Sequence, residues 1–201
     1  MNHIILSIVA YAIASSPQNN HDYSDLIEEA LICSSQQESP AVMNIINGLV
    51  SIERDFFERY HIPNELRGML LSAACNESRF NPLAEGDWRT NSRGQRVSMA
   101  RGILQFWPWA ERKYNFVRAD YQLSAFYWMT HMVYLRQRDL CPNNFSEKRK
   151  WIAAWTQLSR GRLTRENRFR CFQRTKHYGR LLRWQRAIER RNAERTSDCG
   201  C

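Results

Sequence analysis

One glutamate, Glu77, occupies the stretch of the chain best suited to carry chemistry, LRGMLLSAACNESRFNP at Leu66–Pro82. At about 100° per residue, a helix through this stretch places Glu77 on an apolar face. That face is formed by Leu66, Leu70, Ala73 and Ala74. Burial raises the pKa of a carboxyl group, and a carboxylic acid that stays protonated at neutral pH can act as a general acid.

The end of this helix favours the same protonated state. Asn81-Pro82 disfavours helical geometry at Asn81, so we expect the helix to stop just after Glu77, which then lies about a turn from the helix C-terminus. The macrodipole is negative at a helix C-terminus and disfavours an ionised carboxylate there. We therefore expect a raised pKa at Glu77. The alternative is a solvated glutamate whose side chain bends away from the helix end into water.

A second stretch, MARGILQFWPWA at Met99–Ala110, has the residue types that bind sugars. Gly102 allows the backbone to approach a ligand closely. The amide of Gln105 can both donate and accept hydrogen bonds, as sugar hydroxyls and N-acetyl groups require. Sugar rings can stack on the flat apolar faces of Phe106, Trp107 and Trp109. The alternative for these aromatics is core packing, which we expect for at least one of the two tryptophans. The alternative for Gln105 is a polar residue at the surface.

The order of these motifs resembles a known enzyme family. Glu77-Ser78 followed by Asn81-Pro82 is similar to the E-S-x-x-N-P signature of lytic transglycosylases with the soluble-lytic-transglycosylase, goose-lysozyme-like fold. Ala100–Gln105, with Pro108 beyond it, resembles the A-x-G-L-M-Q-x-x-P segment of that family. The two motifs together are more specific than either alone. The resemblance implies a mainly α, lysozyme-like domain with a long loop or small β-hairpin lining the cleft.

Two further segments resemble the family with departures. Ala153–Gln157 stands where the family commonly has A-Y-N-A-G, so that Trp155 replaces the aromatic residue and Thr156 replaces the asparagine. Tyr178 resembles the family's tyrosine near the catalytic glutamate; the alternative is that it packs with its leucine neighbours. The resemblance implies Glu77 as the catalytic residue. It also implies substrate-binding residues, which are Ser78, Gln105, Trp155, Thr156 and Tyr178.

The resemblance further implies a reaction on peptidoglycan glycan strands. A lytic transglycosylase cleaves the β-1,4 bond between N-acetylmuramic acid and N-acetylglucosamine and forms a 1,6-anhydro ring, with one carboxylate as acid and base. It requires neither metal nor cofactor. The nearest alternative is a lysozyme-type muramidase on the same fold, in which Asp87 or Glu85 positions a water. We expect Asp120 to cap a helix instead.

A strongly basic C-terminal region suggests an alternative from another class. The net charge is +9, but residues 1–147 sum to −3 and residues 148–195 to +13. Such a helix suits an anionic membrane surface or cell-wall polymer, and the chain would then be a non-catalytic binding module. A solvated arginine face packed on the domain is the simpler interpretation. Nucleic acid is not an expected partner, because the N-terminus predicts export.

The N-terminal residues predict an export signal. Ile4–Ala14 is an apolar run that is shorter than the roughly 20 residues needed to span a bilayer. Ala12-Ile13-Ala14 has the small-x-small pattern of a cleavage site, although no Lys or Arg precedes the apolar run. The alternative is an uncleaved amphipathic segment or a membrane anchor. A cleaved signal predicts a periplasmic or extracellular protein, in which disulfides can form.

Six cysteines are available for disulfides, and they do not form a metal motif. The chain has no C-x-x-C pair, and its histidines do not cluster with the cysteines, so we expect no zinc site. We expect Cys75 to be a buried free thiol and Cys141 to pair with Cys171. The tail at Cys199–Cys201 is a candidate partner for Cys33. Sequence alone does not determine the connectivity.

The elements that position these residues are mostly helices. The chain length of 201 residues suits one domain with a core, preceded by a signal at 1–14 and an extension at 15–38. The catalytic domain is expected at 39–182, and a basic helix with a cysteine-containing tail at 183–201. Apolar periodicity and capping residues predict helices. These begin near Asp22, Ser39-Pro40, Leu66, Asp120, Ser146, Thr164 and Lys176. Residues 83–98 predict a long loop with a turn at Asn91–Gly94 that suits a β-hairpin.

Overall fold

Seven α-helices and a two-stranded antiparallel sheet form the part of the chain that the computed structural model describes, residues 23–34, 39–138, 145–160 and 176–198. The mainly α prediction is confirmed. The elements follow in the order α2 (Ser24–Ser34), α3 (Pro40–Tyr60), the 3-10 turn η2 (Asn64–Leu66), α4 (Met69–Ser78), β1 (Glu85–Thr90), β2 (Arg96–Arg101), α5 (Pro108–Tyr114), α6 (Tyr121–Gln137), α7 (Glu147–Arg160) and α8 (Lys176–Asp198). The predicted signal and the helix near Thr164 lie outside the described residues.

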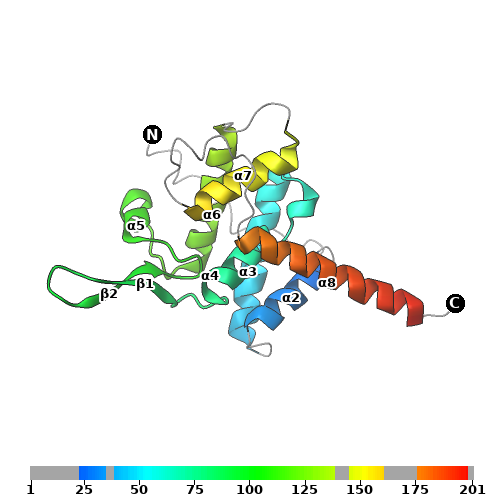
Figure 1. Ribbon diagram of the computed structural model, residues 1–201, viewed down its shortest axis with the longest axis horizontal. Helices are drawn as coiled ribbons and strands as arrows, with labels where there is room; N and C mark the ends of the chain where they lie inside the picture. The colour runs from blue at the N-terminus through cyan, green and yellow to red at the C-terminus, as the bar shows by residue number, and fades with distance from the viewer. Residues whose placement is uncertain (1–22, 35–38, 139–144, 161–175, 199–201) are drawn as a thin grey trace.

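Helix α4 lies at the centre of the molecule, in contact with α2, α3 and α8 (Figure 1). Every residue from Met69 to Cys75 is buried. A helix that is apolar on all sides is stable only when other elements cover it, and these three helices do so. On the far side of α3, helix α6 packs against both α3 and α7. The core therefore surrounds the helix that carries Glu77.

Two helix starts follow the predicted capping chemistry to different degrees. Asp120 caps α6 as expected, since its Oδ1 accepts from the backbone N–H groups of Gln122 and Leu123, both at 3.0 Å. Ser39 occupies the N-cap position of α3, but its side chain makes no capping hydrogen bond. Pro40 at the first helical position sets the backbone angle there without needing a donor.

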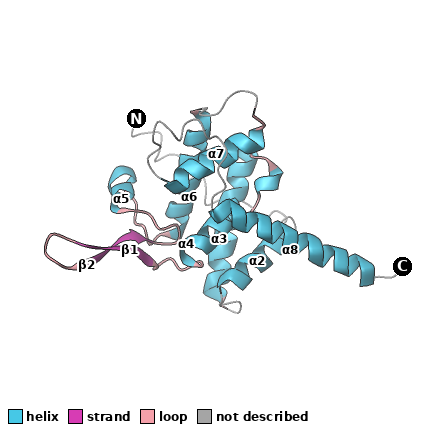
Figure 2. Ribbon diagram, in the orientation of Figure 1, coloured by secondary structure: helices cyan, strands magenta, loops and turns pink. Residues whose placement is uncertain are grey.

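The β-hairpin extends away from the helices (Figure 2). Its turn is held by Asn91, whose Oδ1 accepts from the backbone N–H groups of Arg93 and Gln95 at 2.9 and 3.0 Å. Gly94 supplies the positive φ, 76°, that the turn requires. The predicted hairpin is thus confirmed. Strand β2 continues to Arg101, so the first residues of the Met99–Ala110 stretch belong to the sheet.

The predicted free thiol at Cys75 is wrong, because Cys75 forms a disulfide with Cys33. Packing of α2 against α4 brings their Cα atoms to 6.1 Å, a separation that a disulfide spans without strain. The suggested link between Cys33 and the C-terminal tail is therefore also wrong. The proposed Cys141–Cys171 pair lies outside the described residues.

Removal of this disulfide is expected to lower the free energy of unfolding by about 2–4 kcal/mol, because it closes a long loop in the unfolded chain. The two cysteines are 42 residues apart in sequence. The measurement is denaturant unfolding of wild type and Cys33→Ser/Cys75→Ser with and without reductant. The two proteins should differ under oxidising conditions and agree in reductant. Equal stability under oxidising conditions contradicts the expectation.

Helix α8 is a single basic helix, and it crosses the boundary predicted at residue 183. Arg191 Nη1 contacts Glu29 Oε1 at 2.6 Å, and Leu181 and Trp184 are buried. The C-terminal part of the helix extends past the rest of the molecule (Figure 1). None of the helices in the described ranges is both long and apolar enough to span a membrane.

Candidate active site

Glu77 lies in the last turn of α4, where the helix ends as the sequence predicts. The helix stops at Ser78, and Arg79 and Phe80 follow with positive φ angles of 53° and 65°. The Glu77 side chain is 21% exposed, so it is neither fully buried nor fully solvated. Its carboxylate is therefore within reach of a ligand and partly shielded from water.

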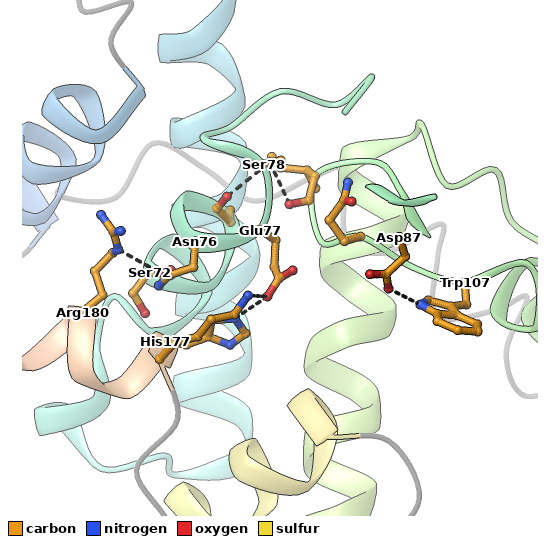
Figure 3. A network of polar contacts seen from close by, with 12 residues as sticks. Ser72, Asn76, Glu77, Ser78, Asp87, Trp107, His177 and Arg180 are labelled. Carbon is orange, nitrogen blue, oxygen red and sulfur yellow. Dashed lines mark hydrogen bonds and ion pairs between the residues drawn. The ribbon is translucent and has the colours of Figure 1, made fainter. Parts of the chain in front are cut away.

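Two donors from the first turn of α8 contact the same oxygen of this carboxylate (Figure 3). His177 Nε2 lies 2.5 Å from Glu77 Oε1, and Lys176 Nζ lies 2.9 Å from it. An ionised carboxylate only accepts, so the imidazole carries its hydrogen on Nε2 in this contact. The start of α8 thus supplies charge and hydrogen bonds to the end of α4, one hundred residues earlier.

These contacts overturn the expectation of a raised pKa at Glu77. Burial alone would raise the pKa, but the hydrogen bonds and charges of His177 and Lys176 outweigh burial and lower the pKa below its ordinary value. Free Glu77 is therefore ionised at neutral pH. The sequence prediction failed because it included the apolar neighbours on α4 and not the two donors on α8.

Ser78 joins the two motifs that the sequence singles out. Its Oγ lies 2.9 Å from the carbonyl oxygen of Ile103, within the Met99–Ala110 stretch, and 3.2 Å from the carbonyl oxygen of Ala74. Its hydroxyl group can donate to either carbonyl. This contact fixes the segment containing Gln105 against the helix end that carries Glu77.

Gln105 fastens the base of the hairpin. Its Nε2 donates to the carbonyl oxygens of Ala84 and Gly102, at 3.1 and 2.9 Å, which lie before β1 and after β2. Gly102 was expected to allow a ligand to approach, but its close neighbour is protein. A Cβ atom there would lie 1.9 Å from the carbonyl oxygen of Arg118, and its φ of 81° also requires glycine.

The three remaining predicted binding residues are buried in the interior of the protein. Trp155 is 0% exposed, and Thr156 and Tyr178 are also buried. The ring of Trp155 lies 6.3 Å from that of His177 and 6.0 Å from that of Tyr178. These buried side chains present little surface to a ligand, and Trp155 packs against the ring of His177. Their role in substrate binding stays a prediction.

The hairpin and the segment that follows it contribute polar and aromatic groups on the side of Glu77 opposite His177 (Figure 3). Asp87 Oδ2 accepts from Trp107 Nε1 at 3.0 Å, and the guanidinium of Arg89 lies 4.7 Å from the Trp107 ring centroid. Trp107 is half-buried and Trp109 is exposed, so the prediction that at least one of them is a core residue is wrong. Glu85 is paired with Arg101 at 2.9 Å.

Backbone strain concentrates around this site. Six non-glycine residues in the described ranges have positive φ, and four of them lie just after Glu77, in the hairpin or in the Met99–Ala110 stretch: Arg79, Phe80, Asp87 and Gln105. Each such residue costs on the order of 1 kcal/mol, and such positions cluster at functional sites. The strain is consistent with a site where side-chain direction matters more than local stability.

Glu53 on α3 holds the start of the helix that carries Glu77, and it was not predicted from the sequence. It is 0% exposed, and its carboxylate accepts from the backbone N–H groups of Gly68 and Leu70 at the start of α4. Gly68 is the N-cap of α4 and has no side chain to satisfy these donors, so Glu53 does so. Burial raises the pKa of Glu53 to about 7, against the opposing effect of the backbone hydrogen bonds. The sequence feature that could have indicated a buried acid is the position of Glu53 on the apolar face of α3, between Leu49 and Phe56.

No group of three or more histidine, cysteine or acidic side chains within the described ranges is arranged to hold a metal ion. No family model, no curated protein and no solved structure matches this chain.

Proposed function

We propose that the protein is a peptidoglycan lytic transglycosylase of lysozyme-like fold, with Glu77 as its acid and base. The observation that supports this most is the contact between Ser78 Oγ and the Ile103 carbonyl oxygen. It joins the two motifs of the resemblance beside a half-buried carboxylate. Two aromatic groups on the hairpin side, the half-buried Trp107 and the exposed Trp109, suit sugar rings.

In the first step, the protonated Glu77 carboxyl gives its proton to the oxygen of the glycosidic bond. The bond between C1 of N-acetylmuramic acid and that oxygen breaks, and the N-acetylglucosamine side leaves with a hydroxyl group. The 2-acetamido oxygen of the muramic sugar stabilises the positive charge that develops at C1. Glu77 is left as a carboxylate, which Lys176 and His177 stabilise.

In the second step, the Glu77 carboxylate removes the proton from the 6-hydroxyl of the same muramic sugar. Its oxygen then attacks C1 and closes the 1,6-anhydro ring, and Glu77 returns to its protonated form. No water is consumed, and one carboxylate suffices for both steps. Because free Glu77 has a lowered pKa, mildly acidic conditions favour the protonated form that starts the cycle.

A hydrolytic muramidase is the second candidate, and Asp87 is the observation that favours it. This exposed carboxylate lies on the hairpin side of Glu77 and is held by Trp107 in a left-handed backbone conformation, with φ 48°. A second carboxylate there can activate a water. Glu85 is less suited to this role, since it is paired with Arg101.

Digestion of purified peptidoglycan followed by mass spectrometry tests the proposal. The expected products end in 1,6-anhydro-N-acetylmuramic acid, and Asp87→Asn is expected to leave that product unchanged. Reducing ends in the wild-type digest, lost in Asp87→Asn, establish the hydrolase instead. Absence of any cleavage contradicts both enzymatic proposals and favours a non-catalytic wall-binding module.

The proposed partners and location follow from the same substrate. We propose that the chain is exported to the periplasm or cell surface, and the Cys33–Cys75 disulfide is typical of such compartments. The exposed arginines of α8, which are Arg183, Arg186, Arg190 and Arg195, suit an anionic cell-wall polymer or membrane surface. Arg191 is less available, because it is paired with Glu29.

A further inference from the structure

The two oxygens of the Glu77 carboxylate have different surroundings. Both donors from α8 contact Oε1, and no polar group in the described ranges contacts Oε2. Figure 3 shows the second oxygen pointing toward the side where Asp87 and Trp107 lie. One oxygen is held by the protein, and the other faces the side that a substrate can reach.

We infer that Lys176 and His177 form a clamp that holds Oε1 of Glu77 and reserves Oε2 for proton transfer. The inference rests on the proposed function and names the residues that position its carboxylate. Both are positioning residues, because they act through Glu77 and not on the substrate. Neither was among the site residues that the sequence predicted.

The clamp is rigid on its histidine side. His177 is 3% exposed, and its ring is stacked on Trp155 at an interplanar angle of 29°. Trp155 is in turn packed edge-on against Trp128. A donor that is fixed in this way selects one rotamer of the carboxylate, which is what a reacting group needs to keep its orientation.

The start of α8 is also fixed against the end of α4. Arg180 Nε donates to Asn76 Oδ1 at 3.0 Å, and its Nη1 lies 3.6 Å from Cys33 Sγ in the disulfide. These contacts lie one turn along α8 from His177 and next to Glu77 on α4. The distance between donor and carboxylate is thus set by the packing of α8 against α4, which the Cys33–Cys75 disulfide in turn links to α2.

The clamp has a consequence for the pH dependence of the reaction. Within the described residues, the titratable and charged groups around Glu77 are Lys176, His177 and Arg180 on α8, Arg79 beyond the end of α4, and Asp87 on β1. The two clamp residues favour the ionised carboxylate, which lowers the pKa of Glu77. Since the first step needs the protonated acid, activity should fall as pH rises through this pKa, and loss of the clamp should move that fall to higher pH.

The test compares wild type with His177→Phe and Lys176→Met, which each remove one donor, and with His177→Gln, which keeps a neutral donor. Lys113→Gln is the matched control, because it removes a charge from an exposed lysine on α5. The Glu77 pKa is measured by carboxyl-carbon NMR titration, with Glu77→Gln to assign the signal. The pH profile of kcat on purified peptidoglycan is measured in parallel.

The expected result is a higher Glu77 pKa in His177→Phe and Lys176→Met, a smaller rise in His177→Gln, and no change in Lys113→Gln. The alkaline limb of the pH profile of kcat should move to higher pH in the same order. At its optimum pH, the kcat of His177→Phe should be lower than that of wild type by on the order of tenfold. Lys176 is 62% exposed, so Lys176→Met keeps the test valid if His177→Phe does not fold.

Two failures can be told apart. An unchanged Glu77 pKa in Lys176→Met and in every folded His177 variant overturns the clamp, whether or not the wild type is active. A wild type that does not cleave peptidoglycan overturns the proposed function, while the NMR titration still reports whether the two donors control the carboxylate.

Discussion

Replacement of Glu77 by glutamine is expected to lower the rate of glycan cleavage by about 10⁴-fold, at the upper end for loss of a general acid and base. The amide can accept from His177 and Lys176 through its oxygen, so the shape of the site is kept. It can neither give a proton to the glycosidic oxygen nor take one from the 6-hydroxyl. Both steps lose their catalyst, and the loss corresponds to about 5 kcal/mol of transition-state stabilisation. The measurement is the initial rate of muropeptide release from purified peptidoglycan.

Glu58→Gln is the matched control for this change. Glu58 is an exposed glutamate on α3, and the same substitution there should leave the rate within a factor of about two, as expected of a surface position. Thermal unfolding of both variants checks that the fold is intact. A folded Glu77→Gln protein that retains a tenth or more of the wild-type rate contradicts the assignment of Glu77.

Local patterns predicted the elements that carry the site. The apolar face before Glu77 and the Asn81-Pro82 pair placed α4 and its end, and Asp120 marked the start of α6. These signals depend on residues within one or two turns of each other, so a single sequence contains them. The hairpin was likewise predicted from local residues, the turn at Asn91–Gly94 within a polar loop.

Contacts between distant segments were not predictable in the same way. The His177–Glu77 contact spans one hundred residues, and the Cys33–Cys75 disulfide depends on how α2 packs against α4. The pKa shift predicted for Glu77 had the wrong direction because the hydrogen bonds and charges supplied by α8 outweighed burial. Trp155 illustrates the reverse case, where a motif position implied ligand contact and the packing buried the ring. Local periodicity carries no information about which helix faces meet.

Replacement of Glu53 by alanine is expected to lower the free energy of unfolding by about 3 kcal/mol. The buried N–H groups of Gly68 and Leu70 lose their acceptor, at about 1–3 kcal/mol each, and part of this loss is offset because a buried carboxylate is also removed. The start of α4 then loses its cap, so the position of Glu77 at the other end of a ten-residue helix becomes less defined. Denaturant unfolding measures the stability, and Glu58→Ala serves as the exposed control on the same helix.

Glu53→Gln separates the charge of this residue from its shape. The folded pKa of Glu53 is raised from 4.5 to about 7, so the native state binds more protons than the unfolded state between these values. The contribution of Glu53 to the free energy of unfolding is therefore fully present below about pH 4.5. It is lost as pH rises through about 7, by about 3 kcal/mol in total. Glutamine cannot ionise, so the stability of the variant relative to wild type should increase from pH 5 to pH 8 by up to that amount. Comparison with wild type cancels the opposite contribution of Glu77, whose pKa is lowered. Parallel pH profiles for the two proteins would show that Glu53 does not titrate as a buried acid, and that its hydrogen bonds to α4 keep it ionised throughout.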